Sequence, residues 1–96
     1  MKPLFLPEAT GDIARAIEYY EAIQINLGLD FLIELEKAVA RIVEYPKAWQ
    51  KISDDFHRCL LGRFPYGIIY SIETDCIIIV SVMNLHQHPD TWKSRI

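Results

Sequence analysis

Apolar residues in the first half of the chain recur at steps of three and four, which is the spacing of one helix face. The first such set lies between Pro7 and Gly28, and the second ends before Pro46, where a helix should stop. The positions are Ile13, Ala16, Ile17, Tyr20, Ile23 and Leu27, then Phe31, Leu32, Leu35, Val39, Ile42 and Val43. We expect Gly28 to close the first helix and Asp30 to cap the second. A connection this short predicts an antiparallel helical hairpin.

Strand patterns flank the hairpin. Residues 2–6 form a short apolar run between prolines, which indicates an edge strand. Residues 46–55 resemble a loop, and from Phe56 the apolar period changes to two. Residues 66–73 and 76–84 then predict two strands around a Thr74-Asp75 turn. The order is β-α-α-β-β-β, an α+β fold with an antiparallel sheet and the N-terminal helical hairpin packed on one face. With 96 residues we expect one domain, 1–96.

Both alternating sets of the last two strands are apolar, which is unusual for a sheet with helices on one side only. In residues 66–73 the two sets are Ile68, Tyr70 and Ile72 against Ile69. In residues 76–84 they are Ile78, Val80 and Val82 against Ile77, Ile79 and Met83. Two helices cover one sheet face, so the other face is predicted to be an apolar surface for a protein partner. The alternative is that residues 90–96 and the 46–55 loop fold back over it.

Charge is unevenly distributed along the chain. Residues 8–45 hold eight acids and three bases, whereas residues 46–96 hold five acids and six bases, with all three histidines. An acidic helical half repels nucleic acid, so any anion-binding surface belongs to the second half, and no direct sequence-specific nucleic-acid binding is expected.

Other features favour a cytoplasmic protein. The longest apolar run, residues 76–80, is too short to span a membrane, so no membrane partner is expected. Residues 1–7 carry one cation and prolines that interrupt the apolar residues, unlike a secretory signal. Cys59 and Cys76 lie in strand-like sequence, as buried thiols do in a reducing compartment.

Candidate catalytic chemistry is sparse. Metal-free ribonuclease chemistry needs an acid, a base and cations on the phosphate, and the candidates for those roles are His86, His88, Arg58, Arg63 and Arg95. Arg58 and Arg63 are five apart, on opposite faces of a regular strand, so they are not expected to clamp one phosphate. The pairs His57/Cys59 and His86/His88 have zinc-ligand chemistry, but the favoured interpretation is strand-edge histidines and core cysteines, with no metal or other cofactor. Trp92 is expected to pack as a lid on the sheet.

An ordered series of residues along nearly the whole chain resembles the RelE/ParE toxin superfamily, most of all its ParE-like plasmid-stabilisation branch. The series is Pro7-Glu8-Ala9, Asp12-Ile13, Tyr19-Tyr20, Leu27-Gly28, Phe31-Leu32, Leu35-Glu36, Pro46, Arg58, Arg63-Phe64-Pro65-Tyr66, Ile69-Tyr70, His86, Pro89, Trp92 and Arg95. The resemblance implies a type II toxin held in a hetero-oligomer by the wrapping tail of a ParD-like antitoxin.

ParE-like toxins poison DNA gyrase by protein-protein binding, and we expect that activity here, without catalytic residues. One alternative is a RelE-like ribosome-dependent messenger RNA endoribonuclease using His86, His88, Arg58 and Arg95. Another is a degenerate, non-toxic module that only binds its partner. The expected partner-binding residues are Arg63, Phe64, Ile69, Ile77, Ile79 and Trp92.

Overall fold

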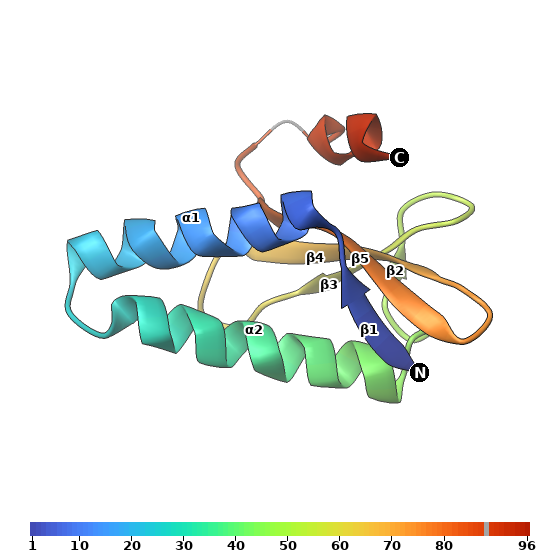
Figure 1. The fold of residues 1–96 in the computed structure, drawn as a ribbon, viewed down its shortest axis with the longest axis horizontal. Helices are drawn as coiled ribbons and strands as arrows, with labels where there is room; N and C mark the ends of the chain where they lie inside the picture. Colours follow the sequence, from blue (N-terminus) through green and yellow to red (C-terminus); the bar gives the residue numbers. More distant parts are fainter. Residues whose placement is uncertain (88) are drawn as a thin grey trace.

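A computed structural model describes residues 1–87 and 89–96 and contains a helical hairpin, a sheet and a short C-terminal turn of helix (Figure 1). The elements are β1 (Lys2–Phe5), α1 (Pro7–Ile23), α2 (Leu27–Glu44), β2 (Gln50–Lys51), β3 (His57–Leu60), β4 (Tyr66–Ile72), β5 (Cys76–Asn84) and the 3₁₀ helix η1 (Thr91–Arg95). The five strands lie in the order β1-β5-β4-β3-β2. The predicted α+β class and hairpin are confirmed. Two elements of the structure were not predicted from the sequence: the short strand β2, which lies within the predicted loop, and the 3₁₀ helix η1.

The sheet is mixed rather than wholly antiparallel. β1 pairs in parallel with β5, from Lys2 opposite Cys76 to Phe5 opposite Ile79, whereas the other neighbouring strands are antiparallel. β3 and β5 therefore run in the same direction as β1, and β4 runs opposite to them. Proline at position 3 is tolerated because β1 is an edge strand.

The hairpin turns earlier than the sequence pattern predicts. α1 ends at Ile23, Asn26 takes a left-handed φ of 73°, and α2 starts at Leu27. The side chain of Glu21 accepts hydrogen bonds from the backbone N–H groups of Asn26 and Gly28, both at 3.0 Å, and so caps α2 from the preceding helix. The predicted roles of Gly28 and Asp30 are therefore wrong. Gly28 lies inside α2, where an added Cβ would be 2.8 Å from the carbonyl oxygen of Ile17.

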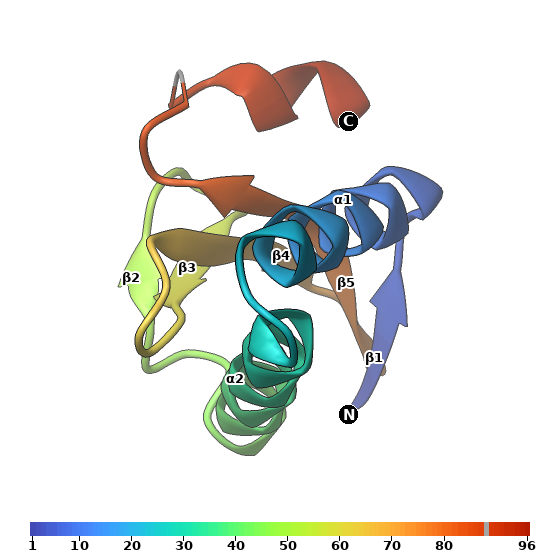
Figure 2. The same cartoon turned by 90° about the vertical axis from the view of Figure 1, so that its left-hand side faces the viewer.

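The main core lies between the hairpin and the sheet (Figure 2). Its members come from both helices and from strands β3 to β5, with the segment that joins β3 to β4. They include Ala9, Ala16, Phe31, Leu35, Ala38, Ile42, Cys59, Phe64, Tyr66, Ile68, Tyr70, Ile77, Ile79 and Val82. Tyr70 donates a hydrogen bond of 2.5 Å to the carbonyl oxygen of Pro46, which ties the end of the hairpin to the sheet.

A register shift in β5 changes which residues face the hairpin. Ile69 lies opposite Ser81 and Tyr70 opposite Ile79, so Val80 has no partner and forms a bulge. Ile79 and Val82 therefore both face the main core, although the predicted alternation put them on opposite sides.

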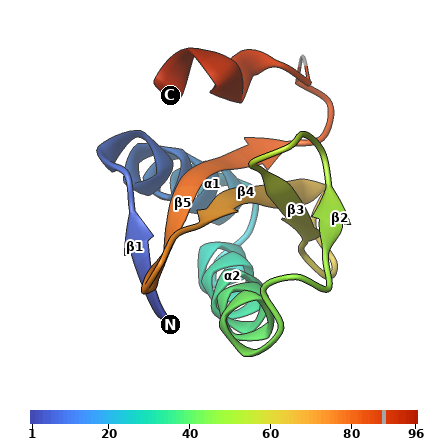
Figure 3. The ribbon, with the colours of Figure 1, turned by 90° about the vertical axis from the view of Figure 1, so that its right-hand side faces the viewer.

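The second face of the sheet is covered, contrary to the prediction of an open apolar face. Ile69 and Met83 are buried there beneath Trp92 of η1, with Ile52 and Phe56 packed against them. The rings of Phe56 and Trp92 are 4.9 Å apart. Figure 3 shows η1 on the side of the sheet away from α2. The folding back of both segments, considered as the alternative, is what the structure has, and Trp92 is the lid that the sequence predicted.

Neither helix in the described part of the chain combines the length and the apolar character that a membrane span requires.

Candidate functional site

An apolar groove runs between α1 and α2 beside the end of β1, with a volume of about 560 Å³. It is lined by Phe5, Thr10, Ile13, Leu32, Leu35, Glu36, Val39 and Ala40. Glu36 is the charged residue of this lining. A groove of this kind between two helices fits the apolar face of a partner helix.

Exposed apolar side chains continue the groove along α2. Leu29 is 54% exposed and Ile33 is 41% exposed, and they lie three residues before Leu32 and Glu36, respectively. Residues three and four apart on a helix are neighbours, so these side chains extend the apolar surface towards the hairpin loop. Phe5, at 39% exposure, extends it on the side of β1. Exposed apolar side chains beside an apolar groove are typical of an interaction site.

The predicted partner-binding residues are mostly interior. Ile77 and Ile79 are fully buried beneath the hairpin, and Phe64 is 8% exposed in the same core. Ile69 and Trp92 are buried against each other on the second face. The expectation that Ile69, Ile77 or Ile79 lies on an open sheet face is therefore wrong. The expected partner contacts of Phe64 and Trp92 are likewise replaced by packing within the chain itself.

Arg63 alone of the predicted partner-binding residues presents its side chain to solvent. It sits in the turn before β4 with a φ of 66°, a left-handed value that is uncommon for a residue other than glycine. Its guanidinium lies 3.4 Å from the carboxylate of Asp30 and 5.6 Å from the centre of the Phe64 ring. The described contacts of Arg63 thus brace the turn against α2, and its side chain is still 59% exposed.

The predicted nuclease residues are not gathered in one place in the described structure. Arg58 lies on β3, which β4 separates from β5, and it donates a 2.8 Å hydrogen bond to Gln50 of β2. Arg95 lies in η1 and is bound to Asp12 of α1. His86 lies in the exposed turn after β5, and His88 lies outside the described residues.

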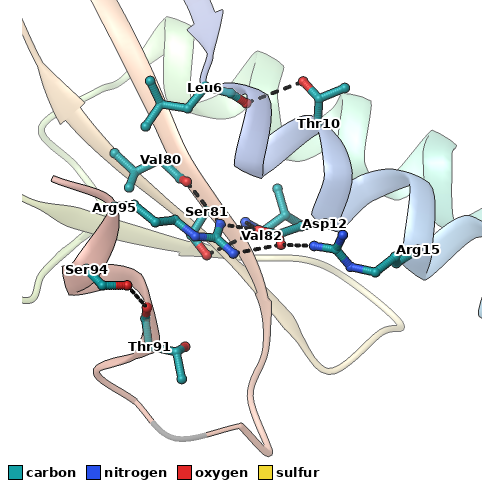
Figure 4. A network of polar contacts seen from close by, with 10 residues as sticks. All are labelled: Leu6, Thr10, Asp12, Arg15, Val80, Ser81, Val82, Thr91, Ser94 and Arg95. Carbon is teal, nitrogen blue, oxygen red and sulfur yellow. Dashed lines mark hydrogen bonds and ion pairs between the residues drawn. The ribbon is translucent and has the colours of Figure 1, made fainter.

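Asp12 is the centre of a polar cluster that joins α1, β5 and η1 (Figure 4). Its carboxylate receives two parallel hydrogen bonds from Arg95, at 2.6 and 2.9 Å, and one from the Val82 N–H at 3.0 Å. Arg15 lies 2.9 Å away on the outer side, and Arg95 also donates to the Val80 carbonyl at 3.2 Å. Such a two-pronged arginine–carboxylate pair is among the stronger polar contacts in proteins.

The cluster changes the acidity of its members. Burial alone would raise the pKa of Asp12, but the hydrogen bonds from Arg95 and Val82, with the positive charges of Arg95 and Arg15, outweigh burial and lower it. The hydrogen bond to Asp12 raises the pKa of Arg95 in turn. Both groups are therefore charged at neutral pH and act as a fixed ion pair between the C-terminal segment and the first helix.

Two of the possible zinc ligands, His57 and Cys59, lie two residues apart on β3. Cys59 is buried in the main core, where burial raises the pKa of its thiol, and His57 stacks on Tyr70 with ring centres 5.4 Å apart. Burial also lowers the pKa of His57. Within residues 1–87 and 89–96, no three histidine, cysteine or acidic side chains come together as a metal site would require.

Sequence reasoning missed the groove and the Asp12 cluster. Leu32 and Val39 had been assigned to the buried face of the second helix. Leu29 and Ile33 could have indicated the groove, because they add apolar residues outside that face. Asp12 gave no such signal, because its partners Val82 and Arg95 are 70 and 83 positions away.

Comparison with known proteins identifies the class of protein to which the chain belongs. The fold matches the solved structure titled "Chromosomal ParDE TA system from P. aeruginosa", with a TM-score of 0.75 and 15% sequence identity, over 90% of this chain and 97% of that chain. At sequence level, the profile described as "ParE toxin of type II toxin-antitoxin system, parDE" matches residues 4–90. The chain therefore belongs to the ParE toxin family. A search of curated proteins found no match.

Proposed function

We propose that this chain, over residues 1–96, is a toxin that inhibits DNA gyrase by protein-protein binding. Membership of the ParE family supports the proposal, since gyrase poisoning is what the resemblance implied for this branch. The placement of the candidate nuclease residues also favours it. The Arg95 guanidinium donates to Asp12 and to the Val80 carbonyl, which leaves it poorly placed to stabilise a phosphate. The proposal places the chain in the cytoplasm, where gyrase acts.

A supercoiling assay with purified gyrase tests this proposal, run beside a ribosome-dependent messenger RNA cleavage assay. We expect loss of supercoiling as the chain is titrated in and intact messenger RNA throughout. Unimpaired gyrase together with cut messages would replace the proposal by the RelE-like endoribonuclease. No effect in either assay and no growth arrest on expression would favour a non-toxic module.

We further propose that a ParD-like antitoxin neutralises the chain in a hetero-oligomer and that an apolar helix of the antitoxin occupies the α1/α2 groove. The groove supports this assignment by its apolar lining, its exposed extension along α2 and its position between two helices. It takes the place of the sheet face that the sequence had favoured, because that face is filled by Trp92.

Charge placed in the groove tests this assignment. Leu32→Glu and Val39→Glu should each prevent co-purification of the antitoxin encoded beside the toxin gene, because a carboxylate buried under an apolar helix is costly. Ile25→Glu is the matched control, since Ile25 is 79% exposed in the hairpin loop, and it should leave the complex intact. Circular dichroism of each variant shows whether the toxin is still folded. A folded Val39→Glu variant that retains the antitoxin would move the binding site elsewhere.

A further inference from the structure

The outer edge of β5 is only partly paired. β1 accompanies β5 as far as Ile79, and the last contact is the hydrogen bond from the Leu6 N–H to the Ile79 carbonyl, at 3.0 Å. Beyond the bulge at Val80 the edge continues to Asn84 without a neighbouring strand. Unpaired strand edges are templates for another chain, unless side chains or loops occupy them.

Two side chains occupy the first part of this edge. Arg95 donates to the Val80 carbonyl, and Asp12 accepts from the Val82 N–H. Because the Val82 N–H points away from β4, the Val82 carbonyl and the Asn84 N–H point the same way. No described residue forms a hydrogen bond with either of these two groups.

The two free groups have the spacing of a parallel ladder. In a parallel pair, one residue of the neighbouring strand donates its N–H to a carbonyl and accepts from the N–H two residues further on. A residue of an incoming strand opposite Met83 would bind the Val82 carbonyl and the Asn84 N–H in this way. Antiparallel pairing would need either the Val82 N–H, which Asp12 already holds, or the Asn84 carbonyl, which already accepts a hydrogen bond from the Gln87 N–H at 3.1 Å. An incoming strand would thus continue the line of β1, itself parallel to β5.

A trough with a volume of about 510 Å³ gives access to this edge. β5 contributes Ser81, Val82 and Asn84, and β4 contributes Tyr66. α1 contributes Asp12, Arg15, Ala16 and Tyr19, and the C-terminal segment contributes Gln87, Thr91 and Arg95. Figure 4 shows the part of it around Asp12, with Arg95 reaching in from η1 and Arg15 from α1. The trough therefore has a strand edge along it and an exposed helix face beside it.

The charge of the trough sets the kind of partner it fits. Its charged lining residues are Arg15, Arg95 and Asp12, so the arginines exceed the carboxylates. The α1/α2 groove has only Glu36, and a third hollow, beside β3 and β4, has Asp54, Asp55 and Glu73. In a chain with a formal net charge of −3, the trough is a local positive site. Arg15 has a side chain that is 71% exposed and can pair with an incoming carboxylate.

We infer that the trough binds an extended, acidic peptide segment of a protein partner, which adds to β5 as a parallel strand beyond the end of β1. Main-chain hydrogen bonds to Val82 and Asn84 give the pairing, and Arg15 selects acidic side chains. The inference rests on neither the gyrase target nor the position of the antitoxin helix in the α1/α2 groove.

The test uses the ¹⁵N-labelled full chain and a capped hexapeptide of alternating valine and glutamate. Amide spectra should show saturable shifts at Asn84 and Met83, and hydrogen exchange of the Asn84 amide should slow at least about fivefold on binding. The same peptide with lysine in place of glutamate should not bind measurably.

Arg15→Glu and Lys37→Glu form a matched pair of variants. Each reverses an exposed cation on a helix and removes an ion pair to an acid three residues earlier, with Asp12 and Glu34, respectively. Arg15→Glu should weaken binding of the acidic peptide about tenfold, and Lys37→Glu should change it less than about twofold.

Three results would each overturn the inference. One is the absence of shifts at Asn84 with the acidic peptide at about 2 mM, because the inference predicts a Kd below that concentration. The second is binding of the lysine peptide as tight as that of the glutamate peptide, or equal affinity of Arg15→Glu and Lys37→Glu for the glutamate peptide. The third is a set of shifts confined to Leu32 and Val39, which would place the peptide in the α1/α2 groove.

Discussion

The ion pair between Asp12 and Arg95 should be a main anchor of the C-terminal segment. Both partners are shielded from solvent, with side-chain exposures of 11% for Asp12 and 22% for Arg95. Replacing one partner leaves the other charge and the Val82 N–H without their full set of bonds. Breaking a buried pair costs about 3–5 kcal/mol, and the residual solvent contact of Arg95 lowers that figure. We therefore expect Asp12→Asn to reduce the free energy of unfolding by about 2 kcal/mol.

A double-mutant cycle measures the pair itself. Asp12→Asn, Arg95→Gln and the double variant should give a coupling energy of about 1.5 kcal/mol at pH 7, measured by urea denaturation and far-ultraviolet circular dichroism. Lys93 and Asp90 are the reference pair from the same segment, with side chains 58% and 55% exposed, and their coupling should be below about 0.5 kcal/mol. Equal coupling energies for the two pairs would refute the reasoning.

The stability difference between the natural chain and Asp12→Asn should also depend on pH. The pKa of Asp12 is lower in the folded chain than in the unfolded chain, where it is about 3.9. Its stabilising contribution is therefore fully present above that value and is lost as the pH falls through the folded-state pKa. The stability difference between the natural chain and Asp12→Asn should be constant from about pH 5 to 7 and shrink below about pH 4. A difference that grows on acidification would contradict the assignment.

Two further predictions concern the helical hairpin and the thiols. Gly28→Ala should destabilise the chain by about 1–3 kcal/mol, since the new Cβ would be 2.8 Å from the Ile17 carbonyl oxygen. Gly11→Ala should be neutral or stabilising, because its Cβ meets only the movable end of the Arg15 side chain. Thermal unfolding compares the two variants, and equal effects on stability would contradict the close contact between the helices. Cys76 is half-buried and should react with a thiol reagent well before Cys59, which is buried and has a raised pKa. Mass mapping after brief labelling measures which cysteine is modified first, and earlier modification of Cys59 would contradict its burial.

The elements that the sequence predicts well are those whose signal is local. The apolar stripes of α1 and α2 and the long strands β4 and β5 follow from periodicity within a few residues, and the structure has them near the predicted bounds. The helix ends are less predictable, because Glu21 caps α2 from another helix and Asn26 supplies the left-handed residue expected at Gly28.

What the sequence could not reveal depends on contacts between distant segments. The bulge at Val80 lies in an apolar run in which no residue indicates it. Simple alternation therefore puts Ile79 and Val82 on opposite sides of the sheet, whereas the bulge turns both towards the main core. The covering of Ile69 by Trp92 joins residues 23 positions apart. The groove was hidden for another reason, since Leu32 and Val39 have the same spacing as core residues and are partly buried against the main core while they also line the groove.

The central claim is that the chain acts by binding gyrase and uses none of its histidines for chemistry. The most direct measurement is inhibition of gyrase supercoiling by the natural chain and by the His86→Ala/His88→Ala double variant, titrated in parallel. The account predicts the same half-inhibitory concentration for both proteins. Absence of inhibition by the natural chain, or inhibition that disappears in the double variant, would contradict it.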